Sequence, residues 1–498
     1  MPTFSLTDLP IVFVSDAAQS THITRAVKRG ELRKLASRLY TRDLKEDPVR
    51  LIRRNWYYLL HAYFPDALIA DRTALENQPA EDGSVFLISN KKRDVELPGL
   101  TFRPRKGPGP LDNDKPFVGG SRLSSTPRAY LENMRASRAR EGVARTLSRA
   151  ELEARLDNII RQQGEDAVNR LRDEARAIAP QLGLEEEATA FSALVGTLLG
   201  TRDVEMQSHA GKARAAGQPF DPDRMQLFET LFAALRQTAP QDRPAPERDG
   251  EANATLAFYE AYFSNFIEGT EFSVQEAENI VFNGVIPDER PEDAHDVLGT
   301  FRLVSDFAEM QRIPGTPNEF IATLRRRHAI IMEGRPDKKP GEFKAKGNKA
   351  GSTVFVEPEL VKGTLEKGFE FLSALTEPFH KAVFMMTLVS EVHPFVDGNG
   401  RVGRVMMNAE LVAKSQERII IPTAYRTDYL GALKAFSKSA HTEPLLRMLN
   451  HAQRYTHAID WNTLTNADKM LHESNAFEQG EDAKLKVDWD KWTKAAGK

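Results

Sequence analysis

The segment SEVHPFVDGNGRVGRV, residues 390–405, limits the fold more than any other part of the chain. The apolar run that leads into it, PFHKAVFMMTLVSEV, has the composition of a helix buried on all sides. Pro394 ends that helix, because proline lacks an N–H and disfavours helix at the preceding residue. Gly398 and Gly400 permit backbone conformations closed to other residues, and GRVGRVMMNAELVAKSQE then reads as a second helix. The segment therefore predicts two helices joined by a tight loop.

The loop carries the residue types of a polyphosphate site. The second helix begins near Gly400, and its free N–H groups and positive dipole end attract anions. Arg401 and Arg404 are three apart, so both guanidinium groups leave one face of the first turn. Asp397 is a hard oxygen ligand suited to Mg²⁺, and His393 can accept a proton near neutral pH. The pattern favours phosphoryl or nucleotidyl transfer to a hydroxyl, with Phe395 packing inward beneath the loop.

Each feature alone has an ordinary structural explanation. A single histidine at a helix end is most often a satisfied core residue, a Gly-Asn-Gly run is usually a turn, and two arginines usually make a solvated face. Their combination in one loop at a helix N-terminus reverses that preference.

The stretch HPFVDGNGRVGR also resembles the signature of the Fic family, His-x-Phe-x-Asp/Glu-Gly-Asn-Gly-Arg-x-x-Arg, at every defining position. The resemblance extends over about residues 254–453 and implies a helical fold that transfers AMP from ATP to a Ser, Thr or Tyr hydroxyl of a target protein. It implies that His393 deprotonates that hydroxyl and that Asp397 binds Mg²⁺. It also implies that Asn399, Gly398 and Gly400 hold the α- and β-phosphates, with Arg401 at the β- and Arg404 at the γ-phosphate.

Other branches of the family perform other chemistry. The kinase-like Doc toxins carry Lys in place of Arg401 and lack the acidic residue, so this sequence favours nucleotidyl transfer. The phosphocholine-transferring branch shares more of the motif and remains an alternative.

Two flanking segments extend the resemblance. GSTVFVEPELV reads as a short hairpin ending at Pro358, similar to the flap that aligns the target by strand addition. The resemblance implies that this flap covers the nucleotide with Thr353, Val354, Phe355 and Val356. Tyr429, in DYLGALKAF, stands where the family has an adenine-side tyrosine, although an ordinary packing role fits it equally. Some relatives have a base-contacting Asn where this chain has Ser437, which leaves the identity of the base open.

A second motif, SNFIEG, lies far upstream at residues 264–269. Ser264 and Glu268 are four apart on one helical face, so they can hydrogen-bond, although a helix end with a surface glutamate fits as well. The motif resembles the inhibitory sequence Ser/Thr-x-x-x-Glu-Gly/Asn of Fic proteins, here including Gly269, in the second of three classes. The resemblance implies that Glu268 pairs with Arg404 and competes with the γ-phosphate, and in some relatives this glutamate supports removal of AMP.

Composition sets the outer limits. A chain of 498 residues predicts about two to four domains. The net charge of -3 gives no global attraction for nucleic acid or membranes, and the absence of cysteine excludes disulfides and thiolate chemistry. No signal peptide or membrane-spanning run is apparent, so we expect a cytoplasmic protein that does not enter a membrane.

The expected fold class is multidomain and mainly α. We expect a winged-helix-like α/β region at 1–140, a helical region at 141–237, a linker at 238–253, a helical Fic fold with its β-hairpin flap at 254–461, and a loosely attached tail at 462–498. The linker prediction rests on three prolines and many charges in TAPQDRPAPERDGEA.

The first region resembles, less specifically, the winged-helix antitoxins of abortive-infection systems. Residues 25–54 contain 11 Lys or Arg against 4 Asp or Glu, a balance typical of contact with DNA phosphates. A protein-binding winged helix fits equally well. If DNA is bound, the candidate contacts are Arg25, Lys28, Arg29, Arg33 and Lys34.

Two functional classes follow from these patterns. The first is an autoinhibited protein adenylyltransferase that uses ATP and Mg²⁺ and acts on a protein hydroxyl. The second is a DNA-binding or toxin–antitoxin-type regulator whose Fic domain senses nucleotide, and removal of AMP remains a further alternative. Homo-oligomers are compatible with either class.

Overall fold

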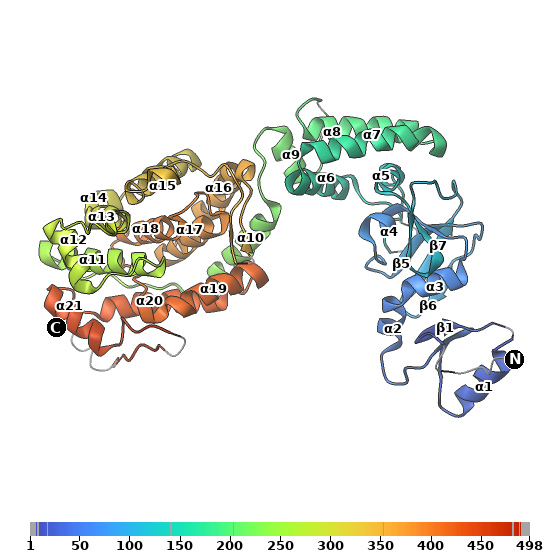
Figure 1. The fold of residues 1–498 in the computed structure, drawn as a ribbon, viewed down its shortest axis with the longest axis horizontal. Coiled ribbons are helices and arrows are strands. Elements are labelled where there is room, and N and C mark those ends of the chain that lie inside the picture. Colours follow the sequence, from blue (N-terminus) through green and yellow to red (C-terminus); the bar gives the residue numbers. More distant parts are fainter. Residues whose placement is uncertain are drawn as a thin grey trace. The chain divides into compact units, whose positions relative to one another are not determined.

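The computed structural model describes residues 6, 9–16, 18–139, 142–202, 204–351, 353–480, 483–487 and 489. The chain divides into two compact units, Met1–Gly217 and Gln218–Lys498. The first unit combines small sheets with helices, and the second consists almost wholly of helices (Figure 1). The expected mainly α, multidomain class is confirmed. None of the helices among the described residues is both long and apolar enough to cross a membrane.

The first unit begins with a small sheet and one helix. Strands β1 (Val12–Val14), β3 (Leu39–Thr41) and β2 (Arg33–Ala36) pair antiparallel in that order. Helix α1 (Ser20–Lys28) buries Ile23 and Ala26. The predicted helix and hairpin are present, but the chain passes from α1 to β2 through residues 29–32 without a second helix. The helix–turn–helix part of the winged-helix expectation is therefore not formed at that point.

A six-stranded mixed sheet follows, in the order β6-β7-β5-β4-β9-β8. Its strands are β4 (Leu68–Ile69), β5 (Ser84–Ile88), β6 (Val95–Leu97), β7 (Leu100–Arg105), β8 (Lys115–Pro116) and β9 (Arg122–Leu123). Strand β5 is buried throughout, as expected for a strand inside a sheet. Helices α2 (Pro48–Arg54), α3 (Trp56–Tyr63), α4 (Asp71–Glu76) and α5 (Thr126–Met134) accompany the sheet, with a short 3₁₀ turn, η2 (Val118–Gly120).

A buried arginine binds the backbone of the Gly- and Pro-rich loop that follows β7. The guanidinium of Arg128 is fully buried and donates to the carbonyls of Pro108 and Gly109 at 2.7 and 2.8 Å. The same group binds Asp114 at 2.7 Å and Glu132 at 2.9 Å. Two carboxylates and two carbonyls thus compensate one buried cation.

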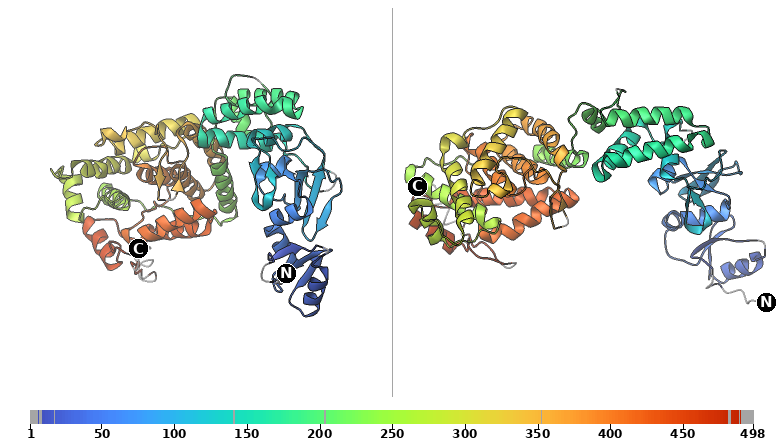
Figure 2. Two further views of the ribbon diagram at one scale, coloured as in Figure 1. Left: turned by 45° about the vertical axis from the view of Figure 1, so that its right-hand side comes forward. Right: turned by 45° about the horizontal axis from the view of Figure 1, so that its top comes forward.

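Helices α6 (Arg149–Gln163), α7 (Glu165–Leu182), α8 (Glu185–Leu198) and α9 (His209–Ala215) complete the first unit. Helix α6 begins with a capping box in which Ser148 and Glu151 satisfy each other's backbone N–H groups. Helices α7 and α8 pack together and lie side by side in both views of Figure 2.

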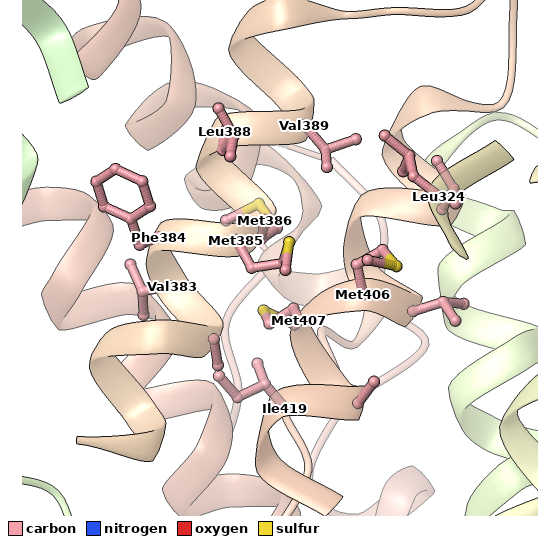
Figure 3. Close-up of a cluster of buried hydrophobic side chains, with 14 of the residues drawn as sticks. Leu324, Val383, Phe384, Met385, Met386, Leu388, Val389, Met406, Met407 and Ile419 are labelled. Atoms are coloured by element: carbon pink, nitrogen blue, oxygen red, sulfur yellow. The ribbon is translucent and has the colours of Figure 1, made fainter. Parts of the chain in front are cut away.

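The second unit has a buried helical pair at its centre. Helix α17 (Pro378–Val392) packs on α18 (Asn399–Val412), and side chains such as Met385, Met406 and Met407 fill the space between them (Figure 3). The prediction of a buried helix ahead of Pro394 is confirmed. The surrounding elements are α10 (Pro222–Gln237), α11 (Gly250–Ile267), α12 (Val274–Asn283), α13 (Pro291–Ser305), α14 (Phe307–Met310), α15 (Pro317–Ile331), η3 (Pro336–Lys338), β10 (Lys349–Ala350), β11 (Thr353–Val354), α16 (Pro358–Ser373), η4 (Thr423–Tyr425), α19 (Arg426–Ser439), α20 (Glu443–Ala458) and α21 (Leu464–Glu473).

The predicted linker at 238–253 differs from the structure. The chain divides at residue 217, and α10 packs on α16 and α17 in the second unit. The proline-rich segment also lies against this unit, where Arg243 donates to Gln453 Oε1 at 2.8 Å and Arg248 pairs with Glu417. The prolines prevent helix, but side-chain bonds attach the extended backbone without it.

The predicted loose tail at 462–498 differs in its described part. Helix α21 places Leu471 in the core, and Ser474 shares a hydrogen bond of 2.6 Å with Tyr455. Residues 481, 482, 488 and 490–498 lie outside the described residues.

Candidate active site

The loop between α17 and α18 is closed by the side chain of Asn399. Its Oδ1 accepts from the Phe395 N–H at 2.8 Å, and its Nδ2 donates to the Phe395 carbonyl at 2.9 Å. Gly398, at φ 73°, provides the left-handed turn that starts α18. The Asn399 amide, expected at the phosphates, thus shapes the loop, because it satisfies two backbone groups at once.

A histidine that the sequence analysis missed packs against this loop on its buried side. The ring of His328, on α15, stacks on Phe395 with centroids 3.6 Å apart, and both residues are fully buried. The Gly341 N–H donates to His328 Nδ1 at 2.9 Å, so Nε2 carries the hydrogen and donates to the Asp397 carbonyl at 2.9 Å. Burial lowers the pKa of His328 to about 4, which keeps this tautomer neutral. His328 precedes Asp397 by 69 residues, so no local spacing pointed to it.

His393 occupies the turn directly after α17, at φ 50°. Its Nδ1 lies 3.3 Å from the Ser390 carbonyl, which can only accept, so Nε2 is left as the proton acceptor. Burial lowers the pKa of His393 to about 4, and the ring is therefore neutral at pH 7. The ring of Phe355 lies flat against it, with centroids 3.8 Å apart and planes at 5°.

Both arginines of the motif are buried and both reach α11. Arg401 pairs with Asp296 of α13 and lies 3.5 Å from Asn265 Oδ1. Arg404 donates from Nε to Ser264 Oγ at 3.0 Å and from Nη2 to Glu268 Oε1 at 2.7 Å. Burial opposes the charge on Arg404, but the pair with Glu268 outweighs this and raises the pKa of the guanidinium.

Ser264 and Glu268 of SNFIEG both bond Arg404, and for Glu268 this is the pairing that the resemblance implied. Helix α11 ends at Ile267, and Gly269 takes a φ of 93° to turn the chain away. The Glu268 carboxylate lies over the first turn of α18, where a Cβ on Gly400 would collide with its Oε1. This is the position where free N–H groups and the helix dipole favour an anion.

A pocket of about 370 Å³ opens in front of these groups. Several residues named in the sequence analysis line this pocket. They are Glu268, Thr353, Phe355, His393, Gly400, Arg404, Tyr429 and Ser437. The hairpin β10–β11 confirms the expected flap, but only alternate residues face the pocket. Val354 is 61% exposed on the outer side and Val356 is fully buried in the core, because side chains alternate along an extended chain.

The residues present fit magnesium only as part of a metal–nucleotide complex. The Asp397 side chain is 41% exposed, and its Oδ1 accepts from the Gly398 N–H at 2.6 Å. Among the described residues, no group of three or more His, Cys, Asp or Glu side chains could hold a metal. One carboxylate together with phosphate oxygens is a usual magnesium environment.

The five candidate DNA contacts lie on α1 and the region after it. Arg25, Lys28, Arg29 and Lys34 are exposed, and Arg33 is half-buried. Arg29 pairs with Glu31 at 2.8 Å, and Arg33 donates to the Glu46 carbonyl at 3.2 Å. These residues make this part of the first unit basic. The contacts of the described residues do not identify what binds there.

One family model matches the part of the chain that contains this loop. Residues 320–411, which include the whole loop, match the model of the Fic/DOC family. The chain thus carries a Fic domain over these residues.

Similar proteins match a wider part of the chain. The protein adenylyltransferase Fic of Drosophila yakuba is 25% identical over 239 residues, which cover 45% of this chain and 47% of the relative. That of Drosophila willistoni is 26% identical with the same coverage. The chain thus spans about half the length of the curated relatives it matches. Among solved structures, Fic-1 (residues 134–508) from C. elegans has 18% sequence identity and a TM-score of 0.35, over 62% of this chain and 87% of that chain.

Proposed function

We propose that the protein is a protein adenylyltransferase that is restrained by its own Glu268. The observation that carries the proposal is the pocket in which a neutral His393 and the buried Arg404 face the N-terminus of α18. The names of the Drosophila relatives support this activity, and the Fic domain supports the family chemistry.

In the proposed reaction the target hydroxyl oxygen attacks the α-phosphorus of ATP. His393 Nε2 takes the hydroxyl proton, the bond from the α-phosphorus to the bridging oxygen breaks, and pyrophosphate leaves. Arg404 and the first N–H groups of α18 bind the β- and γ-phosphates. Asp397 would hold magnesium together with the phosphate oxygens, which neutralises charge on the leaving group.

Glu268 would restrain this reaction by occupying the anion site. Its carboxylate holds the Arg404 Nη2 that a γ-phosphate would need and lies over Gly400. ATP can enter only with its phosphates displaced or with Glu268 moved aside. The isolated protein is then poorly active, and relief requires that the Glu268–Arg404 contact breaks.

The test is labelling with α-³²P-ATP and Mg²⁺. Glu268→Gly should raise self-labelling or lysate labelling at least about tenfold, the scale of a charge-assisted hydrogen bond. Adding His393→Ala should abolish the label. The matched control is Glu271→Gly, an exposed residue in the loop just after α11. Equal labelling by the wild type and Glu268→Gly would refute the restraint, and absence of label in every variant would refute the transfer itself.

A second candidate function rests on the exposed cations of α1 and β2. We propose nucleic-acid binding there, tested by mobility shift with the promoter of the protein's own gene across a salt series. Lys28→Ala and Lys34→Ala should each reduce the salt slope by about one, as expected for a lost phosphate contact. Failure to bind at low salt would remove this candidate.

A further inference from the structure

A single arginine from outside the matched Fic region connects the flap to the active-site helix. Arg224 lies in the first turn of α10, and its side chain is only 12% exposed. Its Nη2 donates to the Val354 carbonyl at 2.7 Å, and its Nη1 lies 3.4 Å from Glu391 Oε2. The guanidinium therefore bridges β11 and the last turn of α17.

Glu391 anchors the other end of this bridge. It stands two residues before His393, its side chain is 4% exposed, and its Oε2 also accepts from Ser437 Oγ at 3.2 Å. Burial raises the pKa of Glu391, and the charge of Arg224 opposes that rise. Arg224 and Glu391 thus compensate each other at the wall of the pocket.

The register of the flap explains why the bond to Val354 matters. Residues 350 and 353 pair, as do 349 and 354, and the Phe355 N–H donates to the Asn348 carbonyl at 3.2 Å. Bonded and non-bonded pairs alternate in an antiparallel ladder, so the Val354 N–H and carbonyl point away from β10. Arg224 therefore holds the outer edge of β11, which is the edge open to another strand.

Closure of the flap also covers the proposed base. Phe355 follows Val354 directly, and its ring lies flat on His393 at a centroid distance of 3.8 Å. A flap released at Val354 loses the attachment that keeps Phe355 on the imidazole.

We propose that Arg224 is a positioning residue that latches the β10–β11 flap over His393, bridging the Val354 carbonyl and Glu391. The functional role of this latch rests on the proposed function, because the flap would then control access of the target hydroxyl to His393. A target segment that pairs with β11 must take the Val354 carbonyl from Arg224. The latch thus couples binding of the target to exposure of the base.

Hydrogen–deuterium exchange of the full-length protein tests the latch without any activity. In Arg224→Ala the amides of residues 349–356 should exchange roughly tenfold faster, the factor that corresponds to one charge-assisted hydrogen bond. Diethyl pyrocarbonate should modify His393 faster by a similar factor. The matched control is Arg236→Ala on the same helix, which removes an exposed arginine that lies over Phe232.

A second variant separates the latch from general damage to the fold. Glu391→Gln keeps an acceptor for Ser437 but loses the ion pair, so it should accelerate flap exchange by a smaller factor. Arg224→Lys should restore part of the protection, because it keeps a donor for Val354. Unchanged flap exchange and His393 modification in Arg224→Ala would overturn the proposal, whether or not the protein transfers AMP. Loss of protection across the whole second unit would also overturn it, because the role would then be structural.

Discussion

The Glu268 carboxylate accepts a hydrogen bond from Arg404 at 2.7 Å while it lies directly over Gly400. The side chain of the residue that follows α11 thus lies where α18 offers both a guanidinium and free backbone N–H groups. The carboxylate thus lies at a helix N-terminus, where backbone N–H groups and the helix dipole favour an anion.

Nucleotides with and without a γ-phosphate should respond differently to removal of this side chain. In a His393→Ala background, where nothing turns over, Glu268→Gly should strengthen ATP binding about tenfold. AMP binding should change little, because AMP has no phosphate that reaches Arg404. Isothermal titration calorimetry in the presence of Mg²⁺ measures how much Glu268→Gly increases the affinity for each nucleotide. An equal increase in affinity for ATP and AMP would contradict competition at Arg404.

Ser264 should contribute a smaller part of the same restraint. Ser264→Ala removes the bond from Arg404 Nε at 3.0 Å but leaves the bond from Nη2 to the Ser264 carbonyl at 2.8 Å. The loss of one hydrogen bond, about 1 kcal/mol, should raise AMP labelling several-fold, less than Glu268→Gly does. Labelling at or above the level of Glu268→Gly would show that Ser264, and not Glu268, holds the arginine.

His328 should position the Asp397 turn. His328→Ala removes the stack under Phe395 and the donor to the Asp397 carbonyl, so we expect a higher Mg²⁺ requirement in the Glu268→Gly background. Measured as labelling against Mg²⁺ concentration, the half-saturating value should rise several-fold, whereas the exposed His441→Ala leaves it unchanged. A fall in maximal rate with no shift in the Mg²⁺ curve would point to a purely structural role.

Stability of the second unit should depend on pH through Glu410. Burial on α18 raises the pKa of Glu410 to about 7, from 4.5. The folded state therefore binds this proton more tightly, and its contribution to stability is full below about pH 4.5 and lost as pH rises through 7. Denaturant unfolding should show a decline of up to about 3 kcal/mol over that window, flattened in Glu410→Gln. The exposed Glu443→Gln is the control, and an equal pH slope in both variants would disprove the assignment.

The local parts of this site were predictable from the sequence, and the long-range parts were not. The end of α17, the turn at Gly398 and the start of α18 follow from proline and glycine, whose backbone preferences act within a few residues. The contact of Glu268 with Arg404 was implied only by resemblance to a family motif. The distance between them along the chain contains no physical signal of proximity.

Tertiary partners account for what sequence reasoning missed. Arg401 was expected at a phosphate, yet it pairs with Asp296 of α13, more than 100 residues away along the chain. His328 and Arg224 had no motif at all, and only folding brings them to the loop and the flap. The proline-rich segment looked like a linker, because composition reports what backbone conformations are allowed and not which neighbours bind the chain.

Arg404 is buried in the structure, so its charge needs a counter-ion, and Glu268 is the one that contacts it. In the proposed reaction a bound polyphosphate would replace the carboxylate as the counter-ion, and the cation would stay compensated. Substitution of Glu268 supplies none, and the empty site then contains an uncompensated buried charge. A Glu268 variant without nucleotide should therefore be less stable to unfolding than the wild type. The side chain that is proposed to restrain the reaction would then also stabilise the fold.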